Sequence, residues 1–576
     1  MALAGEAIRM AGPWTSQRTS RERSPRWVKF GAAAIALSLA LSACGGSSSS
    51  SSDDGGAKVS DVTIKASGEP KTGGTVKFGI EAESDGFNPT TNRWAVSGYM
   101  IGNAVFDPLA AYDASGKWQP YLAKSFTPSA DYKTWTITMR AGVNFSDGTP
   151  VDGAAVAKSL GAVIADPLIG ITLRNIASVT ADPTDPLVAV VTTVDPWASF
   201  PAQMTAQPGY IVAPAQIDAE KPASSNQPIG SGPFIQKEWI PDNHWMGTRN
   251  PNYWRSDEKG NKLPYLDAVE FRPIIDSSAR ASALLSGDIT MMQTSSWIDI
   301  NRLQSEASAG TIQLVADRGE TEETFVLFNT TKAPADDVRV RVGLAWCTDR
   351  DQYLTANEEP LDRAADSQFA PDSPYYVKTD FPNNDVAKGK TLIDEYKADH
   401  PGDVTIVLGA APTPAAIANM SLLAQQWGRC GVTVQQKTTE QSKFIIDTAT
   451  GQYTANIWRQ FAASDPDGDY HWWAGRNATG VLTVNFARLN DPQINEALDK
   501  ARATPDEAVR KEAYATVQKR QTELVPYIWF SHTQWVVGAA KNIRNVTNVS
   551  LPDGQPSAPM LAGFDGALRL TQTWIE

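Results

Sequence analysis

The sequence predicts an α/β fold of two or three lobes with inserted segments. After residue 70 the chain holds about 505 residues, too many for a single hydrophobic core. Segments with alternating apolar residues are interspersed with segments of helical periodicity, without regular strand–helix–strand repetition. No repeat with a period of 20 to 50 residues is visible, which argues against a solenoid or a propeller.

Several segments carry the alternation of apolar residues that predicts strands. "GGTVKFGIEA" (73–82) is bounded by glycines, and "DYKTWTITMRAG" (131–142) places Trp135 and the apolar residues two and four positions later on one face. In the second half of the chain, "TFVLFNTT" (324–331) and "YIWFSHTQWVV" (527–537) also predict strands.

Capping residues mark the ends of the predicted helices. Asp152 follows the tight turn in "SDGTP" and is the expected N-cap of the helix after it. "SARASALLSGDITMM" predicts a helix that closes at Gly287. Near the C-terminal end, "TPDE" has the form of a capping box with Thr504 as the N-cap, and its helix must end before Pro526.

The N-terminal segment has the composition of an export signal. A basic region precedes residues 30–43, which carry no charge and are mostly Ala and Leu. This run is shorter than the roughly 20 residues that cross a bilayer as a helix, so a permanent membrane span is not expected. We therefore expect residues 1–43 to be a signal peptide that is removed after export.

The residues that end this run, "LSAC", resemble the lipobox of bacterial lipoproteins, in which the cysteine is diacylated and becomes the new N-terminus. On this interpretation Cys44 anchors the protein at the membrane surface; the alternative is a chance cysteine in an ordinary secretory signal. Residues 44–70 contain six consecutive serines and too little apolar surface to fold. They predict a flexible tether that spans about 30 Å.

Charge and cysteine content narrow the class of protein further. The net charge of −13 becomes more negative once the basic leader is removed, and this argues against a nucleic-acid partner, whose phosphates attract basic surfaces. Cys347 and Cys430 form an even pair in a chain expected to meet oxidising conditions. They predict either a disulfide or two buried free thiols. The chain has only four histidines, none near these cysteines in sequence, so a metal pair is disfavoured.

The sequence lacks the motifs of common catalytic and cofactor sites. It has no G-x-S-x-G, no H-E-x-x-H and no phosphate-binding loop, and "GSGPFI" has Ile235 where a dinucleotide site needs its third glycine. "DPDGDYHWWAGR" (465–476) has Tyr470 and Arg476 where a calcium loop needs Gly and Glu, which favours a solvated acidic turn or a ligand-contacting loop. We expect no enzyme, no cofactor and no metal.

The chain has 18 tryptophans, several of them in polar segments such as "NRWAVSGY", "IWRQF" and "YHWWAG". Most should fill hydrophobic cores. Tryptophans beside Asn, Arg and Asp also suit a binding pocket, because they combine a large contact area with a polar edge. The pair Trp472 and Trp473 is the first candidate for such a role.

Taken together, these segments resemble a known family. The run from 105 to 160, with its aromatic strand, Arg140, an "F-x-D-G-x-P" motif and a following helix, is similar to the extracellular family 5 solute-binding proteins of bacterial ABC importers. This family includes oligopeptide- and dipeptide-binding proteins. "PIGSGPFIQKEW", "LLSGDI", "FNTTKAPADDVRVRVGLAWCTDRD" and "DPDGDY" follow in the family's order.

The resemblance implies a periplasmic-binding-protein-like clamshell of the large three-domain type, with two lobes joined by a two-strand hinge. The hinge strands would lie near "FVLFNT" and "YIWFSHTQW". The expected parts are a signal peptide (1–43), a lipidated tether (44–70), domain I (70–112, 233–324 and 536–576), domain II (113–232) and domain III (325–535).

The resemblance also implies a ligand cleft between the lobes. In several peptide-binding relatives an aspartate four residues before the proline of the "D/E-P" motif pairs with the free amine of the peptide, but that position here is Ala462. Asp465, Asp467 or Asp469 would have to substitute, or the ligand has no free amine. A carboxylate usual in the helix after "D-G-x-P" is Ala155 here, a change expected to be structural only. The candidate cleft residues are Trp94, Trp458, Arg459, Asp465, Asp467, Trp472, Trp473 and Trp529.

The sequence thus predicts a monomeric, lipid-anchored receptor on the outer face of the bacterial cytoplasmic membrane. It would capture an oligopeptide or dipeptide and deliver it to the permease and ATPase subunits of an ABC importer. The alternatives are the same architecture binding a sugar, a siderophore or a metal complex, or an exported hydrolase that kept this fold.

Overall fold

The computed structural model of the chain describes residues 68–316, 322–460, 463–546, 550–557 and 567–576. The predicted signal peptide, Cys44 and most of the tether lie outside the described residues, as does Ala462. Among the helices in these ranges, none is long and apolar enough to cross a membrane. Three larger β-sheets, here named A, B and C, organise the fold.

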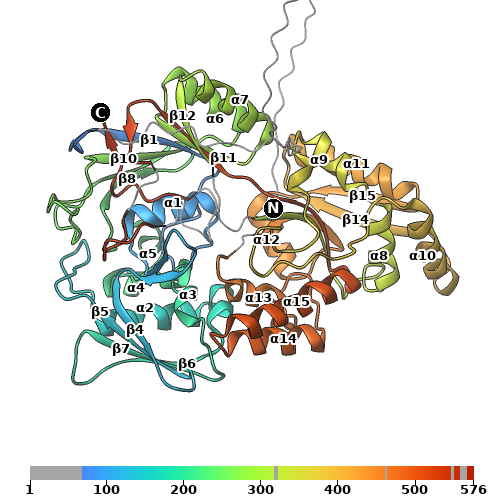
Figure 1. Cartoon of the computed structure of the whole chain (residues 1–576), viewed down its shortest axis with the longest axis horizontal. Coiled ribbons are helices and arrows are strands. Elements are labelled where there is room, and N and C mark those ends of the chain that lie inside the picture. The colour runs from blue at the N-terminus through green and yellow to red at the C-terminus, as the bar shows by residue number, and fades with distance from the viewer. Residues whose placement is uncertain (1–67, 317–321, 461–462, 547–549, 558–566) are drawn as a thin grey trace, which may run out of the picture. The chain divides into compact units, whose positions relative to one another are not determined.

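Sheet A has seven strands in the order β12-β18-β11-β1-β10-β9-β8 (Figure 1). At its centre β1 pairs in parallel with β10 and β11, so segments far apart in sequence share this sheet. Helices α6 and α7 pack on one face, whereas α1 packs on the other. The elements are β1 (Thr75–Ile80), β8 (Phe234–Ile240), β9 (His244–Arg249), β10 (Ala268–Pro273), β11 (Met291–Thr294), β12 (Ile312–Ala316), β18 (Val536–Ala540), α1 (Val96–Val105), α6 (Ser277–Ser286) and α7 (Trp297–Ser308).

Sheet B is antiparallel, with the order β4-β5-β7-β6. Trp135, Ile137 and Met139 of β5 are buried while the residues between them are half-buried, which confirms the predicted face. Asp152 caps α2 as predicted, because its carboxylate accepts a hydrogen bond from the backbone N of Ala155, which itself lies in the sheet B core. The elements are β4 (Ala123–Pro128), β5 (Thr134–Met139), β6 (Ile176–Ala181), β7 (Val188–Thr193) and α2 (Gly153–Ala165).

Sheet C has five strands in the order β15-β14-β16-β13-β17 and is surrounded by most of the helices from the second half of the chain. Cys347 at the end of α8 and Cys430 after α11 are joined by a disulfide, so the structure has the bridge rather than two free thiols. The elements are β13 (Glu323–Phe328), β14 (Val404–Ala410), β15 (Val432–Thr438), β16 (Ala455–Gln460), β17 (Tyr527–His532), α8 (Val338–Cys347), α9 (Arg350–Ala356), α10 (Val386–Asp399), α11 (Pro414–Gly428), α12 (Gln441–Ala449), α14 (Pro492–Arg502) and α15 (Glu507–Leu524).

The chain crosses between sheets A and C at two places. One crossing connects β12 of sheet A to β13 of sheet C, and the other connects β17 of sheet C to β18 of sheet A. The segment 527–537, predicted as one strand, is therefore two strands in different sheets. Residues on both sides of the break have strand character, and only the change of pairing partner after His532 separates them.

Helix ends follow the predicted signals with one correction. Gly287 ends α6 in the left-handed conformation, and α15 ends before Pro526. Thr504 is not the N-cap of α15. Asp506 holds that position and accepts hydrogen bonds from the backbone N of Ala508 and Val509, while the Thr504 hydroxyl accepts from the N of Asp506. A carboxylate next to the first turn interacts more favourably with the exposed N–H groups than a hydroxyl two residues earlier.

Shorter elements complete the fold. Its remaining strands are β2 (Ala110–Tyr112), β3 (Trp118–Pro120), β19 (Ile543–Arg544) and β20 (Trp574–Ile575). Its remaining α-helices are α3 (Phe200–Gln203), α4 (Pro214–Asp218), α5 (Ala223–Asn226) and α13 (Tyr470–Trp473). Its 3₁₀ helices are η1 (Ile169–Leu173), η2 (Gln207–Gly209), η3 (Leu361–Arg363), η4 (Pro466–Asp469) and η5 (Gly475–Asn477).

Candidate functional site

The "DPDG" residues after β16 fold into the short helix η4. Asp465 is its N-cap: the Asp465 carboxylate accepts a hydrogen bond of 2.9 Å from the backbone N of Asp467. Pro466 takes the first helical position, where no N–H donor is needed. The turn buries Asp467, whose exposed fraction is 2 %, so the expectation of a solvated turn is wrong for this carboxylate.

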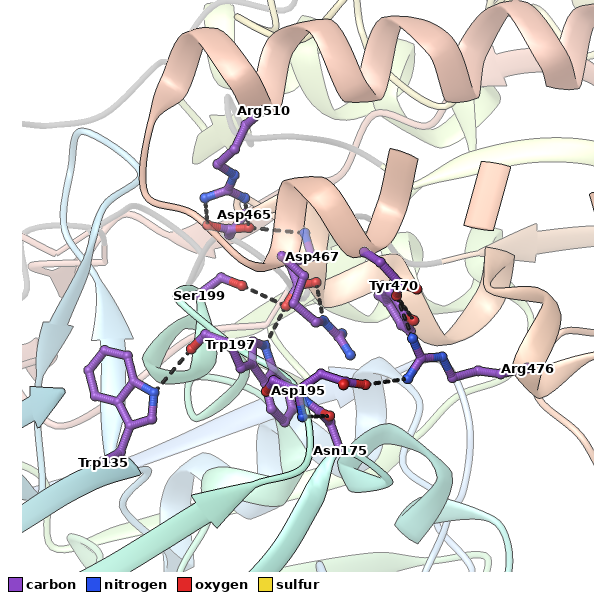
Figure 2. A network of polar contacts seen from close by, with 12 residues as sticks. Trp135, Asn175, Asp195, Trp197, Ser199, Asp465, Asp467, Tyr470, Arg476 and Arg510 are labelled. Carbon is purple, nitrogen blue, oxygen red and sulfur yellow. Dashed lines mark hydrogen bonds and ion pairs between the residues drawn. The ribbon is translucent and has the colours of Figure 1, made fainter. Parts of the chain in front are cut away.

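Asp467 is bonded to groups from two regions of the chain (Figure 2). Its Oδ2 accepts from Trp197 Nε1 at 2.6 Å and from Ser199 Oγ at 2.7 Å, and both donors lie in the segment that follows β7 of sheet B. Its Oδ1 accepts from Arg502 Nε at 2.7 Å, at the end of α14. One buried carboxylate thus connects the sheet B region to the sheet C region.

We name Asp467, Arg502 and Trp197 the seam triad. The Arg502 guanidinium lies over the Trp197 ring, with its Cζ 4.5 Å from the ring centroid, and the backbone N of Ala198 donates to the Arg502 carbonyl at 2.8 Å. Burial alone would raise the pKa of Asp467. The charge of Arg502 and the hydrogen bonds outweigh that effect, so the pKa of Asp467 is lower than its ordinary value.

Further ion pairs surround the seam triad (Figure 2). Arg510 of α15 contacts both carboxylate oxygens of Asp465, one of them at 3.0 Å, and the backbone N of Asp465 donates to the Tyr112 hydroxyl at 3.3 Å. Arg476 lies 3.4 Å from a carboxylate oxygen of Asp195 in the sheet B region. The structure therefore pairs both candidate aspartates, Asp465 and Asp467, with arginines of the protein itself.

A second triad of a carboxylate, an arginine and a tryptophan lies where the chain crosses between sheets A and C. We name Glu322, Arg459 and Trp535 the hinge triad. Arg459 Nε and Trp535 Nε1 both lie 3.0 Å from Glu322 Oε2, and the Arg459 Cζ lies 5.1 Å from the centroid of the Trp535 ring. Glu322 precedes β13 and Trp535 precedes β18, so each crossing segment contributes one member.

Arg459 also reaches the ends of two strands of sheet A. Its guanidinium lies 3.2 Å from Glu81 Oε1, after β1, and donates to Ser295 Oγ at 2.9 Å, after β11. The Arg459 side chain is 36 % exposed, whereas that of Glu322 is 1 % exposed. Burial raises the pKa of Glu322 to about 7, although the charge of Arg459 opposes this shift.

Two of the candidate tryptophans lie close together on the sheet C side. Trp458 and Trp472 are half-buried, and each ring centroid lies 5.2 Å from that of Phe486. We name Trp458, Trp472 and Phe486 the aromatic shelf. These distances are typical of favourable aromatic pairs, and the incomplete burial leaves ring area for a ligand.

The other candidate tryptophans belong to hydrophobic cores. Trp94 packs against Gly98 and Gly102 of α1, and its Nε1 donates to the carbonyl of Gly86 at 3.1 Å. Trp529 packs against aromatic neighbours in the core of sheet C. Trp473 is 4 % exposed, yet its Nε1 has no hydrogen-bond partner among the residues that the structure describes. Such an isolated buried donor is unusual.

Sequence reasoning missed several members of these groups, namely Glu81, Trp197, Ser199, Glu322, Phe486, Arg502 and Trp535. Trp197 and Asp467 are 270 positions apart, and no periodicity or spacing relates them. Phe486, in "VNFARLNDP", has the pattern of an ordinary loop residue. The only available signal was chemical: a tryptophan in the polar run "VDPWAS" could have been a candidate by the criterion used for Trp472.

The chain matches the family model described as bacterial extracellular solute-binding proteins, family 5, middle, over residues 117–481. It is 26% identical over 465 residues to the nickel-binding periplasmic protein of Escherichia coli K12, an alignment that covers 77% of this chain and 86% of that protein. It is 23% identical to the glutathione-binding protein GsiB of Pectobacterium atrosepticum, with the same coverage.

Among solved structures, the fold is similar to the periplasmic binding protein DppA from Helicobacter pylori in complex with the peptide STSA. The TM-score is 0.75 at 21% identity, covering 88% of this chain and 99% of that one. The fold is therefore the predicted α/β clamshell with two lobes and a two-strand hinge. With the family model matching most of the chain, the protein belongs to the family 5 extracellular solute-binding proteins, which bind solutes for ABC importers and are not enzymes.

Proposed function

We propose that this protein is a lipid-anchored receptor that captures oligopeptides or dipeptides between its lobes and delivers them to a membrane permease. The observation that carries the proposal is the pair of triads. The seam triad joins the sheet C region to the sheet B region, and the hinge triad joins it to sheet A, each through a buried carboxylate. Contacts of this kind change when a clamshell opens and closes, and a ligand biases that equilibrium through its preference for the closed form. The related DppA structure, which contains a peptide, supports the ligand class.

The proposed ligand contacts use side chains that are partly exposed, together with one buried hydrogen-bond donor. The aromatic shelf and Arg459 would contact side chains and charged groups of the peptide, and the buried Nε1 of Trp473 would donate to a peptide carbonyl. Asp465 and Asp467 are bonded to Arg510 and Arg502. We therefore propose that a carboxylate other than these two pairs with a free peptide amine.

Calorimetric titration with trialanine and with its N-acetylated form tests the ligand class. A buried carboxylate that loses its cationic partner costs about 2–5 kcal/mol, so acetylation should weaken binding by roughly 30-fold or more. Nickel in the purified protein, detected by elemental analysis, would favour the metal-complex alternative, and cleavage of the peptide would favour a hydrolase. Equal affinity for both peptides would contradict the proposal that the protein recognises a free amine.

The proposed location is the outer face of the bacterial cytoplasmic membrane, with Cys44 as the lipid attachment site and the protein as a monomer. Cys44→Ser should release the protein from membranes into the soluble extracytoplasmic fraction, because a diacyl anchor is lost. Mass spectrometry of the N-terminal peptide should show the acyl groups on Cys44 in the parent protein. Light scattering of the released form should give the mass of one chain.

A further inference from the structure

The seam triad joins two parts of the chain in an asymmetric way. Arg502 belongs to the same sheet C region as Asp467, whereas Trp197 and Ser199 belong to the sheet B region. If the two regions separate, Asp467 keeps its ion pair with Arg502 and loses its bonds to Trp197 and Ser199. Asp467 can therefore exist in both states without becoming an unpaired buried charge, which would be strongly unfavourable.

We call the contact between the sheet B and sheet C regions at the seam triad the seam, and its hydrogen bonds are of a strong kind. The two bonds that Asp467 accepts across it, from Trp197 and Ser199, run from a neutral donor to an ionised carboxylate. Such charge-assisted bonds are about twice as strong as neutral ones. Trp197 is fully buried and Ser199 nearly so, so water competes little for these bonds while the regions are together. The Arg502 guanidinium over the Trp197 ring and the bond from Ala198 N to the Arg502 carbonyl add to the same contact.

Asp467 does not reach a solute in this arrangement. Its side chain is 2 % exposed, and its two oxygens already accept three hydrogen bonds from the protein. Any effect of the seam on solute binding must then act through the fraction of molecules in which the regions are together, because apparent affinity scales with the fraction in the binding-competent state.

We propose that Asp467 is a positioning residue that sets solute affinity through the Trp197 and Ser199 bonds, by holding the lobes together without contacting the solute. This inference deepens the proposed function and depends on solute binding between the lobes. The seam itself can be tested on the protein without solute.

The test uses Trp197→Phe and Ser199→Ala, each of which removes one donor across the seam and leaves the Asp467–Arg502 ion pair intact. Trp245→Phe is the matched control, because Trp245 is also buried and its Nε1 donates to Gln236 Oε1 at 2.7 Å entirely within sheet A. Three quantities are measured: the radius of gyration by solution scattering, hydrogen exchange at the Ala198 amide, and the dissociation rate of trialanine.

Both seam variants should increase the radius of gyration and should speed exchange at Ala198 by roughly tenfold, the factor that corresponds to about 1.4 kcal/mol. Trialanine should dissociate faster by a similar factor, with a smaller change in its association rate. The control should change none of the three. Wild-type-like scattering and Ala198 exchange in both seam variants would overturn the proposal. If both respond but trialanine does not bind the wild type, the seam stands and the proposed ligand class fails.

Discussion

The seam triad and the hinge triad each combine a carboxylate, an arginine and a tryptophan, yet the pKa values of their carboxylates are shifted in opposite directions. In each, an arginine Nε and a tryptophan Nε1 bond to one carboxylate while the guanidinium lies over the indole ring. The pKa of Asp467 is lowered, whereas that of Glu322 is raised to about 7. Residue type alone therefore does not determine the charge state of such a triad.

The difference comes from the surroundings of each arginine. Arg502 is 7 % exposed and bonds to a single carboxylate, so its charge acts on Asp467 through little water. Arg459 is more exposed and is shared between Glu322 and Glu81, and the negative charge of Glu81 adds to the burial that raises the pKa of Glu322. The seam triad thus holds an ion pair that is lost only in acid, whereas the ion pair of the hinge triad depends on pH near neutrality.

Removing the arginine from each triad should give the largest contrast. Arg502→Met leaves the Asp467 carboxylate buried without its cation, and we expect the free energy of unfolding to fall by about 3–5 kcal/mol. Arg459→Met should lower it by only about 1 kcal/mol, because Arg459 is partly exposed and Glu322 can take up a proton. Denaturant titration followed by tryptophan fluorescence measures both.

Lys500→Met serves as the control for this comparison, since Lys500 lies on the same helix as Arg502 but forms an exposed pair with Glu512. Its effect should stay within about 0.5 kcal/mol. Equal losses for Arg502→Met and Arg459→Met would mean that the two triads do not differ in the way their burial indicates.

The next largest contrast should be in how the stability contributed by each triad depends on pH. Because the pKa of Glu322 is raised in the folded protein, folding favours its protonated form, and the wild type loses stability as pH rises from about 4.5 to about 7. Glu322→Gln mimics the protonated form. Its stability relative to the wild type should therefore increase by about 2 kcal/mol between pH 5 and pH 8.

The seam should show the opposite dependence. The pKa of Asp467 is lowered, so its contribution is present above the ordinary pKa of an aspartate and is lost as pH falls below it. Asp467→Asn should differ from the wild type most at neutral pH and least in acid. A Glu322→Gln difference that is flat with pH would mean that the carboxylate is ionised throughout this range.

Local patterns in the sequence predicted several single elements of the fold. The alternation around Trp135, the cap at Asp152 and the left-handed end at Gly287 each depend on neighbouring residues only, and the structure has all three. The break between β17 and β18 could not be predicted in this way. Its residues have strand character on both sides, and the change of sheet is decided by pairing partners elsewhere in the chain.

The sequence predicted which charged residues belong to the candidate site, but not which residues they bond to. The sequence singled out Arg459, Asp465 and Asp467 as charged residues among aromatics, and all three lie in the charged clusters of the structure. Their partners lie tens to hundreds of residues away, as Trp197 does from Asp467. A charged side chain in an aromatic loop therefore indicates that a polar cluster is near. It does not tell whether the protein or a ligand supplies the group that pairs with this charge.

The smallest expected effect concerns a third indole, which extends the comparison to a donor without a protein partner. Trp197 and Trp535 donate to carboxylates, whereas Trp473 Nε1 has no partner among the described residues. Trp473→Phe should therefore leave the free energy of unfolding unchanged or slightly increased, since it removes a buried unpaired donor. If a peptide carbonyl accepts from this indole, the same change should weaken trialanine binding by about fivefold, or about 1 kcal/mol. Calorimetry and denaturant titration on one preparation measure both quantities. A loss of stability without a loss of affinity would place Trp473 with the core tryptophans and would leave the aromatic shelf to hold the solute.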